Sequence, residues 1–306
     1  MGDRVLFLLC ASAGVIVALT LGDIVYQLAS NASPAISRFG LGFLWHTTWN
    51  PHLAQFGAGT LIFGTVVASL AALAIAGPLG VAIAIYLAIM AGPRPRAIIG
   101  PLVEMLAAVP SIIYGFWGLL VLVPFIHNIE PAIHSVLGWI PLFGPAQTTG
   151  IGMFAAALVL TFMILPIVAA LSRDLFLTVP RELTEGAAAL GATQWEIIRG
   201  IVIPSTLSGV TAAMVLALGR ALGEAIAVSL VIGDVNIING SLFQPSATLA
   251  ERLANEFPGA TTNLLIASLW YAGLILLGIG LATSLIARAI ARRFDVEASY
   301  ARAVAG

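Results

Sequence analysis

The sequence predicts an all-α integral membrane protein with six transmembrane helices in a single domain spanning residues 1–306. Hydrophobic residues make up 60% of the chain and charged residues only 9%, whereas about a quarter of the residues of a soluble domain are charged. A helix that crosses about 30 Å of hydrocarbon needs about 20 mostly apolar residues. Six stretches meet that requirement: residues 5–29, 59–90, 97–125, 150–171, 206–235 and 263–290.

The arginines predict the orientation of these helices, because basic residues concentrate on the cytoplasmic side of a membrane. With both termini in the cytoplasm, only Arg38 and Arg252 face outward, and Arg220 lies within a span. The other ten are then cytoplasmic: Arg4, Arg94, Arg96, Arg173, Arg181, Arg199, Arg288, Arg292, Arg293 and Arg302. The opposite orientation would reverse this bias, so both termini are expected in the cytoplasm.

The absence of lysine excludes several functions. All 13 basic residues are arginine, and a nucleotide-binding P-loop needs a lysine for the terminal phosphates. Any ATP-driven activity would therefore depend on a separate ATP-hydrolysing chain. The net charge of −1 gives no electrostatic reason to expect nucleic acid. His127 and His134 alone supply too few ligands for a metal site, and no motif implies a cofactor.

A long loop at residues 173–204, on the predicted cytoplasmic side, has the pattern of two short helices joined by a turn. Pro180 suits the start of a helix, and helix-forming residues then continue to the stop signal at Gly191. Thr193 and Glu196 form a capping box that opens the second helix, and Pro204 precedes the fifth span. Two interpretations remain open on these grounds: a simple connector, or a surface on which another protein docks.

The loop also resembles the EAA loop of ABC importer permeases, with the pattern E-A-A-x3-G-x9-I-x-L-P. Gly186 replaces the first of its two alanines and Ile203 its leucine, but every spacing holds. The resemblance implies that this loop forms a coupling helix that inserts into a groove of the ATPase subunit. The residues that carry it are Glu185, Gly186, Ala187, Gly191, Ile201 and Pro204.

Two charged residues, Arg220 and Glu224, lie about halfway along the fifth predicted span. A charge at that depth costs about 2.5–3.5 kcal/mol on the mildest insertion scale. In an unbroken helix their i,i+4 spacing would place them on one face, where each could partly neutralise the other. They are either a structural ion pair or part of a substrate pathway. The arginine fork suits an oxyanion with several acceptor oxygens.

Pro110 interrupts the third predicted span at a similar depth. A proline within a helix removes one backbone hydrogen bond, and such breaks are tolerated where the freed groups line a cavity. Ser111 and Tyr114 would add hydroxyl donors to that cavity. An ordinary proline kink is the alternative interpretation.

Residues 104–118, 219–233, 39–45 and 254–257 together resemble phosphate-specific ABC importer permeases, so the similarity extends over nearly the whole chain. The residues that follow Glu224, and the outer loops, favour the PstC type of subunit over its PstA partner. The resemblance implies the type I importer (MetI-like) fold. Asp234 departs from the family pattern, in which an asparagine follows Ile-Gly, and an acidic residue near an anion entrance is unexpected.

The resemblance also implies the function and the partners. The chain would be a non-catalytic, multi-pass permease subunit in the bacterial inner membrane, importing inorganic phosphate by alternating access. Its partners would be a PstA-type permease in a heterodimer, two ATPase subunits, an external phosphate-binding protein and membrane lipid. The alternatives are a permease for another oxyanion such as sulfate or molybdate, or a self-sufficient ion-coupled carrier or channel.

Overall fold

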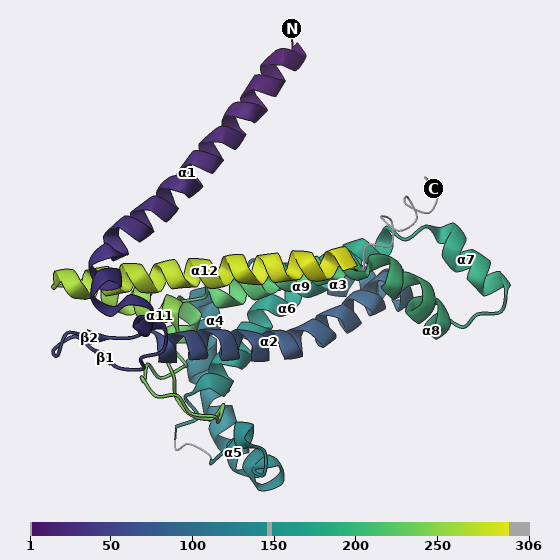
Figure 1. Ribbon diagram of the computed structural model, residues 1–306. Coiled ribbons are helices and arrows are strands. Elements are labelled where there is room, and N and C mark those ends of the chain that lie inside the picture. Colours follow the sequence, from purple (N-terminus) through teal and green to yellow (C-terminus); the bar gives the residue numbers. More distant parts are fainter. Residues whose placement is uncertain (1, 146–148, 294–306) are drawn as a thin grey trace.

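The computed structural model describes residues 2–145 and 149–293, and they are predominantly helical (Figure 1). The α-helices are α1 Gly2–Phe39, α2 Gly59–Ile85, α3 Pro93–Ala107, α4 Ser111–Trp117, α5 Val123–Leu137, α6 Met153–Leu177, α7 Arg181–Ala189, α8 Gln194–Ile197, α9 Ile203–Leu222, α10 Ile226–Ser229, α11 Leu249–Glu256 and α12 Asn263–Arg293. Turns of 3-10 helix occur at Gly40–Leu44, Pro141–Phe143 and Phe257–Gly259, and turns of π-helix at Tyr86–Met90, Gly118–Leu122 and Ile198–Val202. Strands β1 Trp49–Asn50 and β2 Gln55–Phe56 form a small antiparallel hairpin.

Six helical segments are long and apolar enough to cross a membrane, which confirms the predicted six-span, all-helical class. Their bounds differ from the prediction most at the first, third and fifth spans, and the first runs over Asp3–Leu44 rather than 5–29. The third candidate runs over Ser111–Leu137 rather than 97–125, because Pro110 separates it from α3. The fifth covers Gln194–Leu222 rather than 206–235, because α9 ends at Leu222.

Helix α6 forms the centre of the packed bundle and contacts both α2 and α9. Alanines on α2 (Ala68, Ala72 and Ala76) are fully buried in the cluster that includes Val159 and Leu160 of α6. Small side chains let two helix backbones approach closely, as helix pairs in membranes require. A second contact chain continues from α9 to α12 and from α12 to α1.

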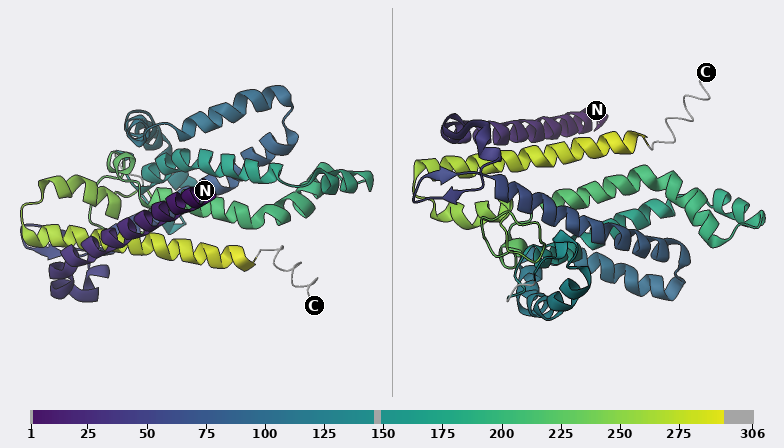
Figure 2. Two further views of the ribbon diagram at one scale, coloured as in Figure 1. Left: turned by 90° about the horizontal axis from the view of Figure 1, so that it is seen from above. Right: turned by 60° about the horizontal axis from the view of Figure 1, so that its bottom comes forward.

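The two ends of the bundle carry different structures (Figures 1 and 2). Helices α7 and α8 project from one end, named here the α7 end, and β1, β2 and α11 gather at the opposite end, the α11 end. At the α11 end, Phe43 stacks on Tyr271 of α12 with ring centroids 4.5 Å apart. The N-terminal half of α1 diverges from the bundle, and its most apolar segment is 0% buried.

Candidate substrate cleft and docking loop

The first helix interruption, at residues 108–110, separates α3 from α4. Pro110 has no N–H, so it cannot make the helical hydrogen bond to the carbonyl of Leu106. The Tyr114 hydroxyl donates to that carbonyl over 2.7 Å, and the Tyr114 side chain is buried. The sequence predicted Tyr114 as a donor along the pathway; in this structure its hydroxyl donates to this backbone carbonyl, which also accepts the Val109 N–H over 3.3 Å.

The second interruption separates α9 from α10. Helix α9 ends at Leu222, and Oε1 of Glu224 accepts a hydrogen bond of 3.1 Å from the backbone N–H of Ala227, in the first turn of α10. Arg220 is in the last turn of α9, so it and Glu224 do not share one continuous helix face. Within the described ranges no ion pair joins them, and the i,i+4 pairing expected for an unbroken span is therefore not formed.

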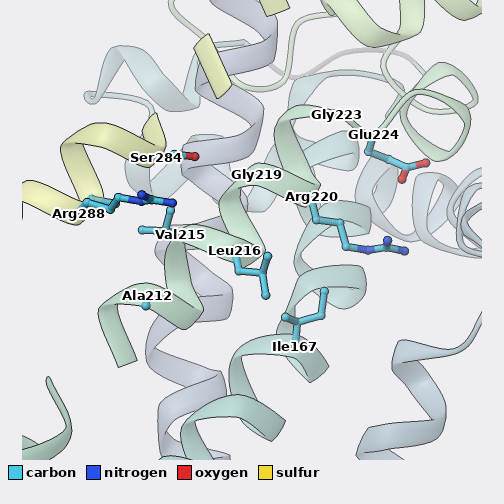
Figure 3. A pocket seen from close by; sticks show the side chains of 11 residues that line it. Ile167, Ala212, Val215, Leu216, Gly219, Arg220, Gly223, Glu224, Ser284 and Arg288 are labelled. Atoms are coloured by element: carbon cyan, nitrogen blue, oxygen red, sulfur yellow. The ribbon is translucent and has the colours of Figure 1, made fainter. Parts of the chain in front are cut away.

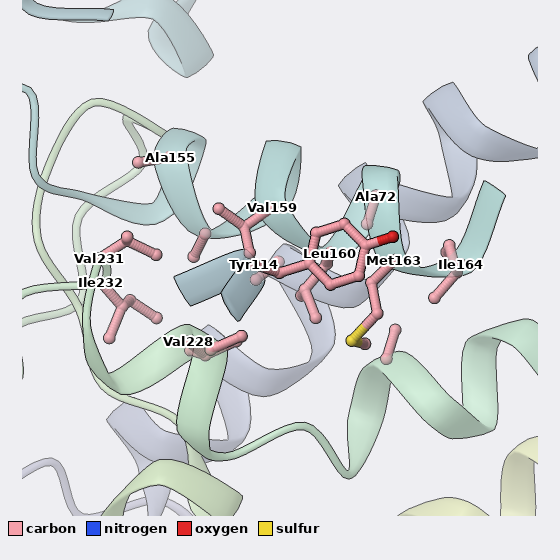
Figure 4. Packing of buried hydrophobic residues seen from close by; sticks show 14 of the residues in the cluster. Ala72, Tyr114, Ala155, Val159, Leu160, Met163, Ile164, Val228, Val231 and Ile232 are labelled. Carbon is pink, nitrogen blue, oxygen red and sulfur yellow. The ribbon is translucent and has the colours of Figure 1, made fainter. Parts of the chain in front are cut away.

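The segments that follow the two interruptions pack on each other. Helix α4 contacts α10, and a Cβ atom added to Gly115 would lie 3.0 Å from Cα of Ala227 and 2.7 Å from the Leu230 side chain. Glycine is therefore required for this close approach. Figure 4 shows Tyr114 between Leu160 and Met163 of α6 on one side and Val228 of α10 on the other. The predicted interruption at Pro110 and the unpredicted one after Leu222 thus belong to one packed centre.

A cleft of about 810 Å³ opens between α9 and α12 beside this centre. Figure 3 shows that the Arg220 and Arg288 side chains lie on it from different helices. Its lining residues are Ile167, Ala212, Val215, Leu216, Gly219, Arg220, Gly223, Glu224, Ser284, Ala287 and Arg288. Among the described residues, this lining includes the predicted Arg220 and Glu224 but not Pro110, Ser111 or Tyr114.

Two polar residues of the cleft, Ser284 and Arg288, were not predicted as pathway residues. They are four residues apart on α12, which places them on one helix face. In the sequence, Arg288 contributed only to the predicted membrane orientation. The i,i+4 spacing of Ser284 and Arg288 indicates that they share a helix face. It does not indicate that this face of α12 packs against α9.

The loop between α6 and α9 has the predicted helix–turn–helix form. Helix α7 ends in a Schellman motif, in which the Ala192 N–H donates to the Ala187 carbonyl and the Gly191 N–H to the Ala188 carbonyl, each over 3.0 Å. Gly191 adopts φ = +90°, in the left-handed region that favours glycine. The predicted stop at Gly191 and the capping box of Thr193 and Glu196 are both present.

The surface of this loop is apolar as well as exposed. Leu190 is 91% exposed, Trp195 64% and Leu183 52%, and Glu185 and Gly186 are also exposed on α7. A protein surface that contacts only water rarely concentrates large apolar side chains. A surface that binds another protein uses such side chains as anchors. The sequence did not indicate Leu183, Leu190 and Trp195 as exposed apolar side chains of this loop.

Comparison with known proteins relates this architecture to a family. Residues 80–296, which include the cleft and the loop, match the family described as binding-protein-dependent transport system inner membrane component. The chain belongs to this family. The match, together with the six candidate spans, makes it a multi-pass inner membrane protein.

Individual relatives of this inner membrane component support the assignment. It is 43% identical over 302 residues to the phosphate transport system permease protein PstC of Mesorhizobium japonicum, covering 96% of this chain and 91% of the relative. Among solved structures it resembles a chain of the inward-facing MetNI methionine ABC transporter, with a TM-score of 0.53, 18% identity and coverage of 78% and 94%. It also resembles a chain of a bacterial alginate ABC transporter in complex with its substrate-bound periplasmic protein, with a TM-score of 0.57, 15% identity and coverage of 92% and 95%. The structural likenesses show the type I importer fold.

At the α11 end, this transport component contains a buried charge network that the sequence analysis did not identify. Arg252 is 5% exposed and forms ion pairs of 2.7 Å with both Asp234 and Glu256. Its guanidinium also donates to Asn236 over 3.1 Å and lies over the ring of Trp49. Asp234, which departs from the family pattern, therefore has a defined structural partner.

Glu251 belongs to the same network and is fully buried in the first turn of α11. Its carboxylate accepts hydrogen bonds from the Thr248 N–H at 3.3 Å and from the Asn255 amide at 2.7 Å. Burial, and secondarily the nearby Asp234 carboxylate, raises the pKa of Glu251 from 4.5 to about 7, although Arg252 acts in the opposite direction. Glu251 thus changes charge near neutral pH.

Proposed function

We propose that this chain is the PstC-type membrane subunit of an ATP-driven importer for inorganic phosphate. The observation that carries this proposal is the 43% identity, over nearly the whole of both chains, to a relative named for phosphate transport. The exposed Arg220 in the membrane cleft supplies suitable chemistry, because a guanidinium fork fits an oxyanion with several acceptor oxygens.

Arg220 offers the anion a transient contact during transport. Because the Glu224 carboxylate accepts the Ala227 N–H, Arg220 has no carboxylate partner within 4 Å among the residues described. The arriving anion then supplies the neutralising charge. Its affinity at Arg220 should be modest, since a substrate bound tightly midway along a pathway would not leave.

ATP hydrolysis occurs on a partner chain, and this subunit is not an enzyme. Family membership implies an ATPase and a substrate-binding protein as partners. In the full proposal the other subunits are a PstA-type permease in a heterodimer, a dimer of ATPase subunits at α7 and an external phosphate-binding protein. Both termini and α7 face the cytoplasm, and movement of the loop around Glu185 and Gly191 couples ATP binding to alternating access.

The test is phosphate uptake into proteoliposomes that contain the complete complex, with binding protein outside and ATP inside. Arg220→Ala should lower uptake by at least about tenfold, the loss expected for one charge-assisted contact, while assembly stays intact. Arg220→Lys, which keeps the charge but not the fork, should retain part of the uptake. Wild-type uptake by an assembled Arg220→Ala complex would remove Arg220 from the pathway.

The same vesicles separate the rival functions. Sulfate or molybdate uptake in place of phosphate would favour a permease for another oxyanion, with the binding protein as the selective subunit. Transport by this chain alone, without an ATPase, would favour an ion-coupled carrier or a channel. The phosphate importer requires phosphate uptake that stops when either the ATPase or ATP is omitted.

A further inference from the structure

The cleft carries a second arginine that the proposed function does not use. Arg288 is on α12, close to the end of that helix and exposed, and it lines the cleft opposite α9. Figure 3 shows its side chain extending toward α9 on the side of Val215, whereas Arg220 extends from the last turn of α9. Two guanidinium groups from different helices therefore lie on one cleft.

The two arginines lie at different depths. Arg288 approaches α9 near Val215, and the helix rises about 8 Å from there to Arg220, at about 1.5 Å per residue. The direction from Val215 to Arg220 leads away from the α7 end, because α9 begins next to the docking loop and ends in the bundle centre (Figure 1). Arg288 is therefore closer to the α7 end than Arg220.

Both guanidinium groups lack a carboxylate neighbour. Within residues 2–145 and 149–293, no Asp or Glu oxygen lies within 4 Å of Arg220 or Arg288. Three other arginines are engaged: Arg96 donates to two backbone carbonyls at 2.8 Å, Arg173 pairs with Glu104 at 2.9 Å, and Arg252 is in the α11-end network. An arginine that faces a largely apolar cleft without an internal counter-ion is suited to an external anion.

We propose that Arg288 is a second anion contact, which receives the oxyanion after Arg220 as it moves toward the α7 end. This inference rests on the proposed function, because it places the step within the same transport path. Two weak contacts in series allow an anion to leave the first as it reaches the second, which a single strong site would prevent. The ligand class is a small tetrahedral oxyanion, for which inorganic phosphate is the probe.

The decisive experiment compares Arg288→Gln with Arg94→Gln in the complete complex. Arg94 is exposed at the start of α3, so its substitution removes a basic residue from the α7 end without altering the cleft. Phosphate uptake per assembled complex should fall about tenfold in Arg288→Gln and stay at the wild-type level in Arg94→Gln. Equal uptake by both variants would show that Arg288 only contributes to membrane anchoring, and would overturn the inference.

A charge-restoration experiment covers the case in which Arg288→Gln assembles poorly. Arg288→Cys is made with Cys10→Ser and cysteine-free partners, and the assembled complex is treated with a cationic, a neutral or an anionic methanethiosulfonate. Uptake should recover only with the cationic adduct, and equal uptake with all three would reject the anion contact. Failure of wild-type vesicles to take up phosphate would instead reject the proposed function, so the two failures are distinguishable.

Discussion

The buried carboxyl of Glu251 should make the stability of the α11 end depend on pH. The pKa of Glu251 in the folded protein is about 7, above its ordinary value of 4.5, because burial and the Asp234 carboxylate disfavour the charged form. Between these two values the folded state holds a proton that the unfolded state has released. Stability should therefore fall as the pH rises from about 4.5 to 7 and change little above that range.

The size of the effect follows from the same two values. At about 1.4 kcal/mol for each pKa unit, the difference between 4.5 and about 7 corresponds to about 3 kcal/mol of lost stability. Glu251→Gln mimics the neutral carboxyl and can still accept a hydrogen bond from the Thr248 N–H. The variant should match the wild type near pH 4.5 and exceed its stability by up to about 3 kcal/mol at pH 8.

The assay is the thermal unfolding midpoint of the protein in detergent micelles, measured from pH 4.5 to 8. The wild-type midpoint should fall across this range more steeply than that of Glu251→Gln, so that the two curves diverge with pH. Glu182→Gln, in the exposed first turn of α7, is the matched control and should follow the wild type. Parallel curves for the wild type and Glu251→Gln would show that Glu251 is ionised throughout, contrary to the reasoning.

Two further substitutions test the docking loop and the first interruption. Gly191→Val places a β-branched residue at φ = +90° at a cost of at least about 1–2 kcal/mol, and should abolish ATPase pull-down, whereas Gly186→Ala within α7 should preserve it. Retained pull-down and retained stimulation of ATP hydrolysis in Gly191→Val would remove the docking role. Tyr114→Phe removes the hydroxyl donor of the Leu106 carbonyl, which keeps the Val109 N–H, and should lower the free energy of unfolding by about 0.5–1.5 kcal/mol; an unchanged unfolding midpoint would contradict the role of that bond.

The docking loop shows which features a sequence can predict. Helix α7 was expected to start at Pro180 and to stop at Gly191, and the structure has α7 at Arg181–Ala189 with Pro180 as its N-cap and Gly191 at φ = +90°. The Thr193 capping box was predicted equally well. These features depend on hydrogen bonds between residues three to five positions apart, so the local sequence contains all the partners that form them.

The cleft and the α11-end network were not predictable in this way. Residues 97–109 and 111–137 are both rich in apolar side chains, so the apolar composition alone cannot decide which of them belongs to the third span. The pairing of Arg252 with Asp234, and the approach of Arg288 to α9, join side chains that are distant in sequence. Only the packing of the helices brings such groups together, and the composition of each helix does not specify its neighbours.

The break after Leu222 changes the chemistry expected of the membrane charges. In an unbroken fifth span Glu224 would be one turn from Arg220 and would neutralise it, leaving a structural ion pair with little attraction for an anion. In the structure the chain leaves the helix at Gly223, and Glu224 instead accepts the N–H of Ala227 at the start of α10. The backbone break thus engages the carboxylate and leaves the Arg220 guanidinium facing the cleft. A continuous helix would instead allow these two residues to pair with each other.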